Sequence, residues 1–188
     1  MFSRTPDEEK RFTAVYKIVT LGEPAVGKTS LVTKYVTGRF NRDYRRTLGI
    51  DISTYDSKIE DNLFKLLIWD LAGQDIFVDL RTRYCQGASG GIVVFDLTRP
   101  QTFEVVHEWV DAIRNSVGYD PILILLGNKA DLGSNRKITK EQGEALAKKL
   151  GLLMYRETSA KTGMQVTECF NTLARLMYQQ KQEEAAKL

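Results

Sequence analysis

The segment GEPAVGKTS, residues 22–30, directly follows the apolar run YKIVTL. A turn after a strand needs one glycine, whereas this segment has Gly22, four further residues, and then Gly27, Lys28 and Thr29. This spacing is that of a P-loop, in which backbone N–H groups and a helix N-terminus face an anion. The segment therefore predicts a pyrophosphate site, with Lys28 reaching the β- and γ-phosphates and the Thr29 hydroxyl on Mg²⁺.

A P-loop alone could belong to an ATPase, a small-molecule kinase or a GTPase, so the base must be recognised elsewhere. The segment NKAD, residues 128–131, follows a predicted strand. Guanine presents two donors that the two carboxylate oxygens of Asp131 can accept, whereas adenine would leave this carboxylate unpaired, and such sites discriminate by about 10⁴-fold. Alone, NKAD could be an ordinary polar loop. The segment TSAK, residues 158–161, follows a second predicted strand and favours the guanine site.

Short apolar runs alternate along the chain with segments of helical period, which indicates a doubly wound α/β fold. Residues 60–62 are too short for a crossover helix and must join two antiparallel strands. We therefore expect a P-loop NTPase fold, with helices on both faces of a mostly parallel six-stranded sheet and one antiparallel edge strand. The predicted strands are 15–21, 50–59, 63–71, 91–97, 122–127 and 152–157, and the predicted helices are 29–36, 103–117, 139–150 and 166–178.

The composition indicates one domain with a full core, because 43% of the 188 residues are hydrophobic. We expect this domain to span residues 13–178. Residues 1–12 then form a flexible N-terminal tail, and residues 179–188 form a C-terminal helix end or tail.

The balance of charges and cysteines excludes several other classes of protein. The 27 Lys and Arg residues are spread among 24 Asp and Glu residues, which gives no nucleic-acid footprint. Cys85 and Cys169 lie far apart with no CxxC motif, which argues against a disulfide framework or a zinc site. No apolar stretch approaches the roughly 18 residues of a membrane span, and the charged start is not a signal peptide. We expect a soluble, cytoplasmic monomer.

Five motifs in order resemble the Ras-like small GTPases over residues 16–177. They are GEPAVGKT, YRRTLGID with Thr47, DLAGQ at 70–74, NKAD and TSAK. Within that superfamily, KLLIWDLAGQ and GIVVFDLT are most similar to the Rab branch. The resemblance implies a switch that binds GTP or GDP with Mg²⁺ and hydrolyses GTP slowly, at about 10⁻⁴ to 10⁻² s⁻¹. It also implies a role in membrane traffic or signalling.

The resemblance also implies roles for single residues. Thr47 closes over the γ-phosphate and Mg²⁺, Phe40 meets the guanine edge-on, and Asp70 holds Mg²⁺ through water. The Gly73 N–H senses the γ-phosphate, and Gln74 positions the attacking water. The catalytic set is Gln74, Lys28 and Thr47, and the metal set is Thr29, Thr47 and Asp70. The nucleotide set is Ala25, Val26, Gly27, Lys28, Thr29, Ser30, Phe40, Thr47, Gly73, Asn128, Lys129, Asp131, Ser159, Ala160 and Lys161.

Two loops, about 39–49 and 73–85, should order with GTP and relax with GDP. Exchange factors, activating proteins and effectors should bind through residues about 39–52 and 73–85. No arginine is assigned as a built-in finger, and the first loop's Arg39, Arg42, Arg45 and Arg46 are expected to face partners. The C-terminus has no prenylation cysteines, so an anchor is absent, lies in a longer native chain, or is replaced by a partner.

Pro24 departs from the glycine found in Ras at this P-loop position. Its ring is expected near Gln74, where it could impede stimulated hydrolysis, or it could simply make the loop rigid. A second departure is Ile52, where many Rabs have phenylalanine. The alternative function is therefore a non-hydrolysing, GTP-bound interaction module of the same fold. A P-loop kinase is disfavoured, because no lid arginines or second substrate pocket can be recognised.

Overall fold

A six-stranded sheet forms the centre of the computed structural model, which describes residues 11–41, 47, 49–71 and 78–187, with backbone alone at 78–81. The strand order is β2-β3-β1-β4-β5-β6, and only the β2–β3 pair is antiparallel. The predicted fold class is confirmed. The strands are β1 (Ala14–Leu21), β2 (Ile50–Ile59), β3 (Asn62–Leu71), β4 (Gly90–Asp96), β5 (Ile122–Asn128) and β6 (Met154–Glu157).

The hairpin between β2 and β3 has the short connection that the sequence predicts. Ile59 pairs with Asn62, so only Glu60 and Asp61 form the turn. Glu60 adopts a left-handed conformation with φ of 55°, as such tight hairpin turns require. The hairpin makes β2 one edge of the sheet.

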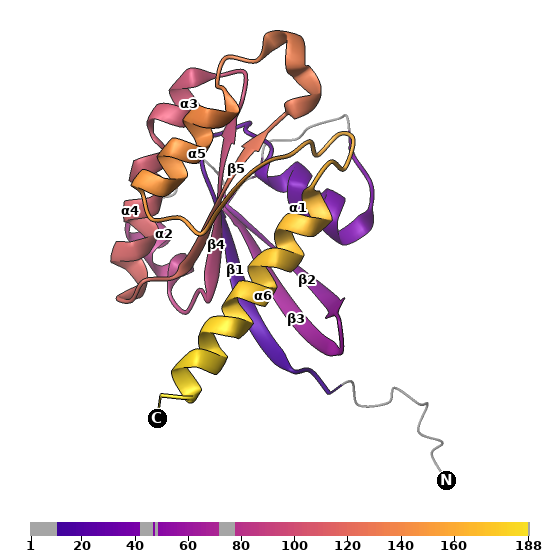
Figure 1. Cartoon of the computed structure of the whole chain (residues 1–188), viewed down its shortest axis with the longest axis vertical. Helices are drawn as coiled ribbons and strands as arrows, with labels where there is room; N and C mark the ends of the chain where they lie inside the picture. The colour runs from indigo at the N-terminus through magenta and orange to yellow at the C-terminus, as the bar shows by residue number, and fades with distance from the viewer. Residues whose placement is uncertain (1–10, 42–46, 48, 72–77, 188) are drawn as a thin grey trace.

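The helices cover both faces of the sheet (Figure 1). Alternate residues of a strand point to opposite faces, so Ile18 packs with α1 and α6 while Val19 packs with α4 and α5. Each face therefore has its own apolar core. The helices are α1 (Lys28–Thr37), α2 (Val78–Cys85), α3 (Pro100–Glu104), α4 (Val106–Val117), α5 (Lys140–Lys149) and α6 (Val166–Ala185), with a 3₁₀ helix η1 (Ala130–Asn135).

Three helices differ from the prediction. The expected helix at 103–117 begins earlier, at Pro100, and is divided at Val105, which ends α3 and precedes α4. Proline favours the first turn of a helix, which explains the early start. Helix α6 runs to Ala185 rather than to residue 178, because good helix formers such as Gln and Glu continue it after its apolar stripe ends.

The third difference is α2, which lies in the segment 73–85 that was predicted to be a loop. Cys85 at its end is fully buried in the core that contains α4. The burial of Cys85 helps to stabilise α2, and no helical periodicity in the sequence predicted this helix. None of the helices in the described part of the chain combines the length and the apolar character that crossing a membrane requires. Residues 1–10 of the expected N-terminal tail lie outside the described residues.

Candidate nucleotide-binding site

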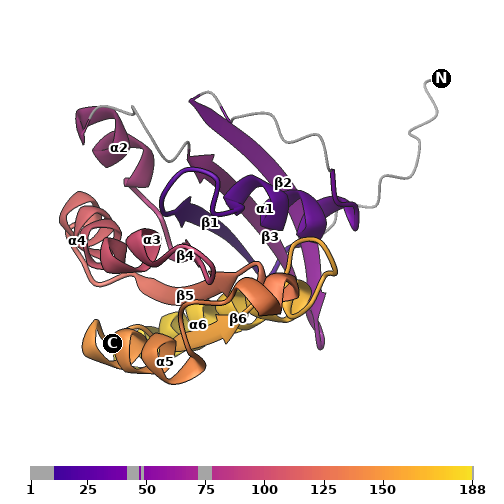
Figure 2. The same cartoon turned by 90° about the horizontal axis from the view of Figure 1, so that it is seen from above.

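A pocket of about 390 Å³ opens where the carboxyl ends of the parallel strands meet. Figure 2 shows from above the loop between β1 and α1 that forms part of it. Nine of the lining residues were predicted: eight belong to the motifs, and the ninth is Phe40. Asn41 and Leu132 were not predicted. The full lining is Ala25, Gly27, Ser30, Phe40, Asn41, Asn128, Lys129, Asp131, Leu132, Ala160 and Lys161.

Both P-loop glycines are required by the backbone around them. Gly22 has φ of 132°, and a Cβ there would collide with the carbonyl oxygen of Val94. Gly27 has φ of 99° and precedes α1, and a Cβ there would collide with the Asn128 side chain. In the described part of the chain no side chain caps the start of α1. Its first N–H groups can therefore face an anion.

Lys28 is buried within the loop, with 6% of its surface exposed. Its Nζ donates hydrogen bonds to the carbonyl oxygens of Gly22, at 2.7 Å, and Glu23, at 3.0 Å. Burial lowers the pKa of Lys28 to about 8, although the nearby carboxylates of Asp70 and Glu23 oppose this shift. A phosphate would stabilise the buried ammonium far better than neutral carbonyls do.

The three predicted magnesium residues converge. The Oγ1 atoms of Thr29 and Thr47 lie 2.6 Å apart, and the Thr29 hydroxyl donates to Oδ2 of Asp70. Oδ1 of Asp70 accepts from Thr20 at 2.7 Å, and burial raises the pKa of Asp70. Two hydroxyls and one carboxylate are the hard oxygen ligands that suit Mg²⁺ when phosphate oxygens complete the shell. The residues present therefore fit this ion.

Asn128 connects the P-loop to the TSAK segment. Its Nδ2 donates to the carbonyl oxygen of Val26 at 2.8 Å. Its Oδ1 accepts from the Thr158 hydroxyl and from the Ala160 N–H, both at 3.3 Å. Asn128 is only 1% exposed, so these bonds are shielded from water. The residue fixes two loops relative to one another.

Asp131 is oriented by a neighbour from the other base-side segment. Its Oδ1 accepts a hydrogen bond from the Ser159 hydroxyl at 2.7 Å, and Nζ of Lys161 lies 3.9 Å from Oδ2. The Asp131 side chain is 13% exposed, although its backbone makes the residue as a whole exposed. A carboxylate oxygen accepts more than one hydrogen bond, so both oxygens can still bind the donors of guanine.

Two arginines that contact the segments around the pocket were not predicted from the sequence. Arg99 contacts Asp96 and the P-loop carbonyl of Pro24, and Arg136 forms two 2.6 Å bonds to the carboxylate of Glu157. Arg136 follows η1, and Glu157 directly precedes Thr158, so this pair joins the two base-side segments. Arg99 lies shortly after β4, and β4 ends at the same edge of the sheet as the strands that precede the motifs. This position could have indicated a role for Arg99.

Some predicted site residues also pack in the apolar core, and others lie outside the described residues. Phe40 lines the pocket and also packs against the apolar core beside α1. The Val26 side chain is buried in that core, so its contribution is through the backbone. Gly73 and Gln74, and with them the proximity of Pro24 to Gln74, lie outside the described residues. The same holds for Arg42, Arg45 and Arg46.

The fold and the loop at residues 22–29 define a P-loop nucleotide-binding protein. A sequence model described as the Ras family matches residues 17–179. The chain is 39% identical over 166 residues to the Ras-related protein Rab-13 of Mesocricetus auratus, a match that covers 88% of this chain and 81% of that protein. The Ras-related protein Rab-13 of Bos taurus matches with the same identity and the same coverage. The chain therefore belongs to the Ras family, and the resemblance to the Rab branch is confirmed.

Membership of this family confirms the predicted class of function. The protein is a small GTPase, a guanine-nucleotide switch that hydrolyses GTP to GDP and phosphate. These similarities do not favour the non-hydrolysing module.

Proposed function

We propose that the pocket binds GTP and GDP with the guanine between the NKAD and TSAK segments and the phosphates on the P-loop. The Asp131 carboxylate, oriented by the Ser159 hydroxyl at 2.7 Å, is the observation that carries this assignment. The Lys28 ammonium, buried in the P-loop next to the pocket-lining Gly27, supplies the phosphate contact. The contacts proposed are the full set assigned by resemblance, from Ala25 to Ser30 and at Phe40, Thr47, Gly73, Asn128, Lys129, Asp131, Ser159, Ala160 and Lys161.

The hydroxyls of Thr29 and Thr47, with Asp70 acting through water, are proposed to hold Mg²⁺. Bound there, Mg²⁺ supplies positive charge to the β- and γ-phosphate oxygens. The hydrogen bond between Thr29 and Asp70 can persist, because the Thr29 oxygen can bind the ion with a lone pair while its O–H still donates to Asp70. Asp70 is kept in place by its second bond, to Thr20.

For hydrolysis, Gln74 is proposed to orient the attacking water, while Lys28 stabilises the charge that develops on the phosphates. Thr47 completes the closure over the γ-phosphate. The test is single-turnover phosphate release from purified protein loaded with GTP, compared with Gln74→Leu and with an ATP control. We expect slow release from the wild type, slower release from the variant, and none from ATP. Equal release from both proteins would contradict the role of Gln74.

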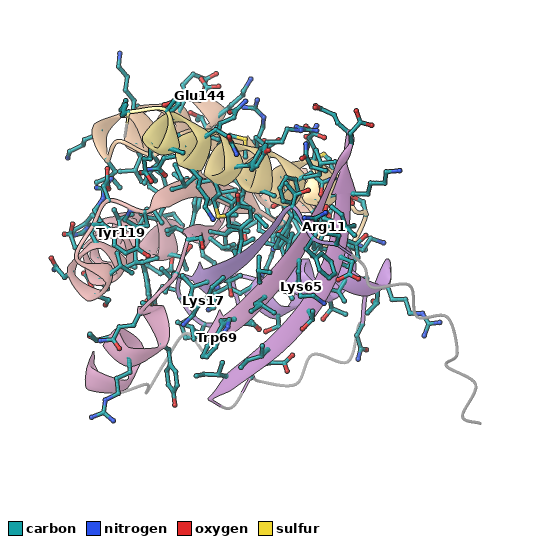
Figure 3. All side chains as sticks on the ribbon, turned by 90° about the horizontal axis from the view of Figure 1, so that it is seen from below. Arg11, Lys17, Lys65, Trp69, Tyr119 and Glu144 are labelled. Atoms are coloured by element: carbon teal, nitrogen blue, oxygen red, sulfur yellow. The ribbon has the colours of Figure 1, made fainter. Side chains whose placement is uncertain are left out.

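The surfaces at residues 39–52 and 73–85 are proposed to bind effectors, exchange factors and activating proteins. Within the described part, Ile52 is 53% exposed on the edge strand β2. Nearby, the ring centroids of Trp69 and Tyr84 are 6.2 Å apart. The Nζ atom of Lys17 lies over the Trp69 ring, 3.8 Å from its centroid (Figure 3). This apolar patch with one cation suits a protein partner.

We further propose that the protein acts as a monomer in the cytoplasm and is recruited to membranes. Gel filtration of the GDP-bound and GTP-bound forms tests the first point.

A further inference from the structure

Arg99 occupies an unusual position beside the P-loop. It lies three residues after the end of β4 and directly before α3, and its side chain is 34% exposed. Its Nε donates to Oδ2 of Asp96 at 2.9 Å, and its Nη2 donates to the carbonyl oxygen of Pro24, also at 2.9 Å. One guanidinium thus joins the end of a core strand to the phosphate loop.

The carboxylate of Asp96 makes this arrangement rigid. Asp96 is 1% exposed, and Oδ1 accepts from the N–H and the hydroxyl of Thr98 at 2.9 and 2.7 Å. Oδ2 lies 2.8 Å from Nζ of Lys129, in addition to its bond with Arg99. The same buried charge therefore holds one residue of the base-side segment NKAD and the arginine that contacts the P-loop.

The carbonyl that Arg99 contacts belongs to a strained part of the loop. It lies in the peptide unit between Pro24 and Ala25, and Ala25 has φ of 59°. This left-handed conformation is unfavourable for a residue with a Cβ. Rotation of the peptide unit would relieve the strain by changing ψ of Pro24 and φ of Ala25 together. Such a flip would also reverse the direction of the Ala25 N–H.

The orientation that Arg99 holds is the one that can serve a phosphate. In a trans peptide the C=O and the N–H point in opposite directions. With the Pro24 carbonyl directed to Arg99, the Ala25 N–H points away from the arginine, and Ala25 lines the pocket. Pro24 itself has no N–H to offer, so the Ala25 N–H is the first donor available after Glu23.

We propose that Arg99, braced by Asp96, is a positioning residue that locks the Pro24–Ala25 peptide unit with its N–H toward the phosphates and thereby slows nucleotide release. This inference rests on the proposed binding of guanine nucleotide in the pocket. It assigns Arg99 no contact with the nucleotide. Because the bond from a charged donor to a carbonyl outweighs an ordinary neutral one, its loss should change the release rate by about tenfold.

The test compares Arg99→Ala with the matched control Arg114→Ala. Arg114 is 31% exposed, and its Nε donates to an aspartate, Asp120, at 3.0 Å. Its Nη1 donates to the carbonyl oxygen of Leu150, also at 3.0 Å. The two arginines thus make the same kinds of bond at the same exposure. Arg114 does so at the ends of α4 and α5, however, and neither it nor its partners line the pocket.

Release of a fluorescent GDP analogue is measured after addition of excess GDP. We expect about tenfold faster release from Arg99→Ala and a rate within about twofold of the wild type from Arg114→Ala. An Arg99→Ala rate within twofold of the wild type would overturn the proposal. Arg99→Met, which keeps the aliphatic stem, replaces Arg99→Ala if the unfolding midpoint shows that the latter does not fold. If the wild type binds no GDP at all, the proposed function itself fails.

A second readout separates the lock from a simple loss of positive charge. Hydrogen exchange of the Ala25 amide is followed by NMR in the GDP-bound proteins. The proposal predicts faster exchange and a shifted amide resonance for Ala25 in Arg99→Ala and an unchanged one in Arg114→Ala. Faster GDP release with an unchanged Ala25 amide would show that charge alone acts, and would overturn the lock.

Discussion

In the proposed binding mode, the base end of the pocket, formed by NKAD and TSAK, and the phosphate end, formed by the P-loop and the residues proposed to bind Mg²⁺, are built in different ways. At the base end, side chains already bond across separate loops: Asn128 donates to the Val26 carbonyl and accepts from the Thr158 hydroxyl, and Ser159 orients Asp131. At the phosphate end, the groups that should contact the ligand bond to one another or to the backbone of the P-loop. Lys28 donates to carbonyls of its own loop.

The residues at the phosphate end that are proposed to bind Mg²⁺ also bond to one another. Thr29 bonds to Thr47 and to Asp70, and its hydroxyl oxygen keeps a lone pair that can bind Mg²⁺. The base end is therefore held together largely by bonds between loops, whereas the bonds of the phosphate end are made by the groups that should contact the phosphates and Mg²⁺. This difference suits a switch, because discrimination of the base requires a fixed frame and the response to the γ-phosphate requires contacts that can be made and lost.

The largest effect should come from the base end. Asp131→Asn replaces one of the two acceptors for guanine by a donor, so we expect GTP affinity to fall by about 10³-fold or more while the preference over ATP is lost. Calorimetry with both nucleotides measures this. Asp120→Asn, at a carboxylate 78% exposed and outside the pocket lining, is the control and should bind GTP normally. Retained selectivity in Asp131→Asn would show that the base is read elsewhere.

A second substitution breaks the bond that joins the two ends. In Gly27→Ala the new Cβ would collide with the Asn128 side chain at a φ of 99°, so the bond to Val26 must break. We expect a loss of about 3 kcal/mol in the free energy of unfolding, measured by denaturant titration. Gly38→Ala has a φ of 70° but no atom within 4 Å of the new Cβ, and should lose only about 1 kcal/mol. Equal losses would mean that backbone strain alone matters at Gly27.

The phosphate end depends on charge. Lys28→Met removes the buried ammonium, and we expect GDP affinity to fall by about 10²-fold, from the loss of charge-assisted bonds to the phosphates. Lys34→Met is the matched control, since Lys34 lies on the same helix and its Nζ also donates to a carbonyl, that of Gly38, at 2.9 Å. Unchanged GDP affinity in Lys28→Met would place the phosphates away from this loop.

The smallest effect concerns the pair that supports the base end. Hydrogen bonds from Arg136 lower the pKa of Glu157. Because the folded-state pKa lies below the unfolded value of about 4.3, the pair stabilises the fold fully above that value and the contribution is lost as the pH falls through the folded-state pKa. The side chains are 31% and 18% exposed, so screening limits the loss in Glu157→Gln to about 1 kcal/mol.

Unfolding titrations of the wild type and Glu157→Gln at several pH values check this. The difference in unfolding free energy should be constant from pH 6 to 8 and should shrink below about pH 4. The exposed Lys140–Glu144 pair supplies the control, Glu144→Gln, with a loss under about 0.5 kcal/mol. A difference that grows in acid would contradict the assigned direction of the pKa shift.

The same contrast between local and long-range features explains what the sequence could predict. The strands and the hairpin at Glu60 follow from neighbouring residues, and the structure confirms them. The polar motifs were placed at strand ends, and the structure brings NKAD, TSAK and the P-loop into one pocket. In each of these cases a short stretch of sequence contains the physical cause.

Contacts between distant residues without a motif were missed. Arg99 and Pro24 are 75 residues apart, and Arg136 and Glu157 are 21 apart, so no spacing rule relates them. Helix α2 depends on the burial of Cys85 under α4, which only the folded arrangement provides. The prediction that α6 ends near residue 178 was wrong, because the polar residues that follow carry high helix propensity without an apolar stripe.

The central claim is that one pocket holds a guanine base at Asp131 and phosphates at Lys28. Calorimetric titration of folded, nucleotide-free protein with GTP and with ATP in the presence of Mg²⁺ tests it most directly. We predict tight binding of GTP and a preference over ATP of about 10⁴-fold. Equal binding of the two nucleotides, or binding of neither, would contradict the account.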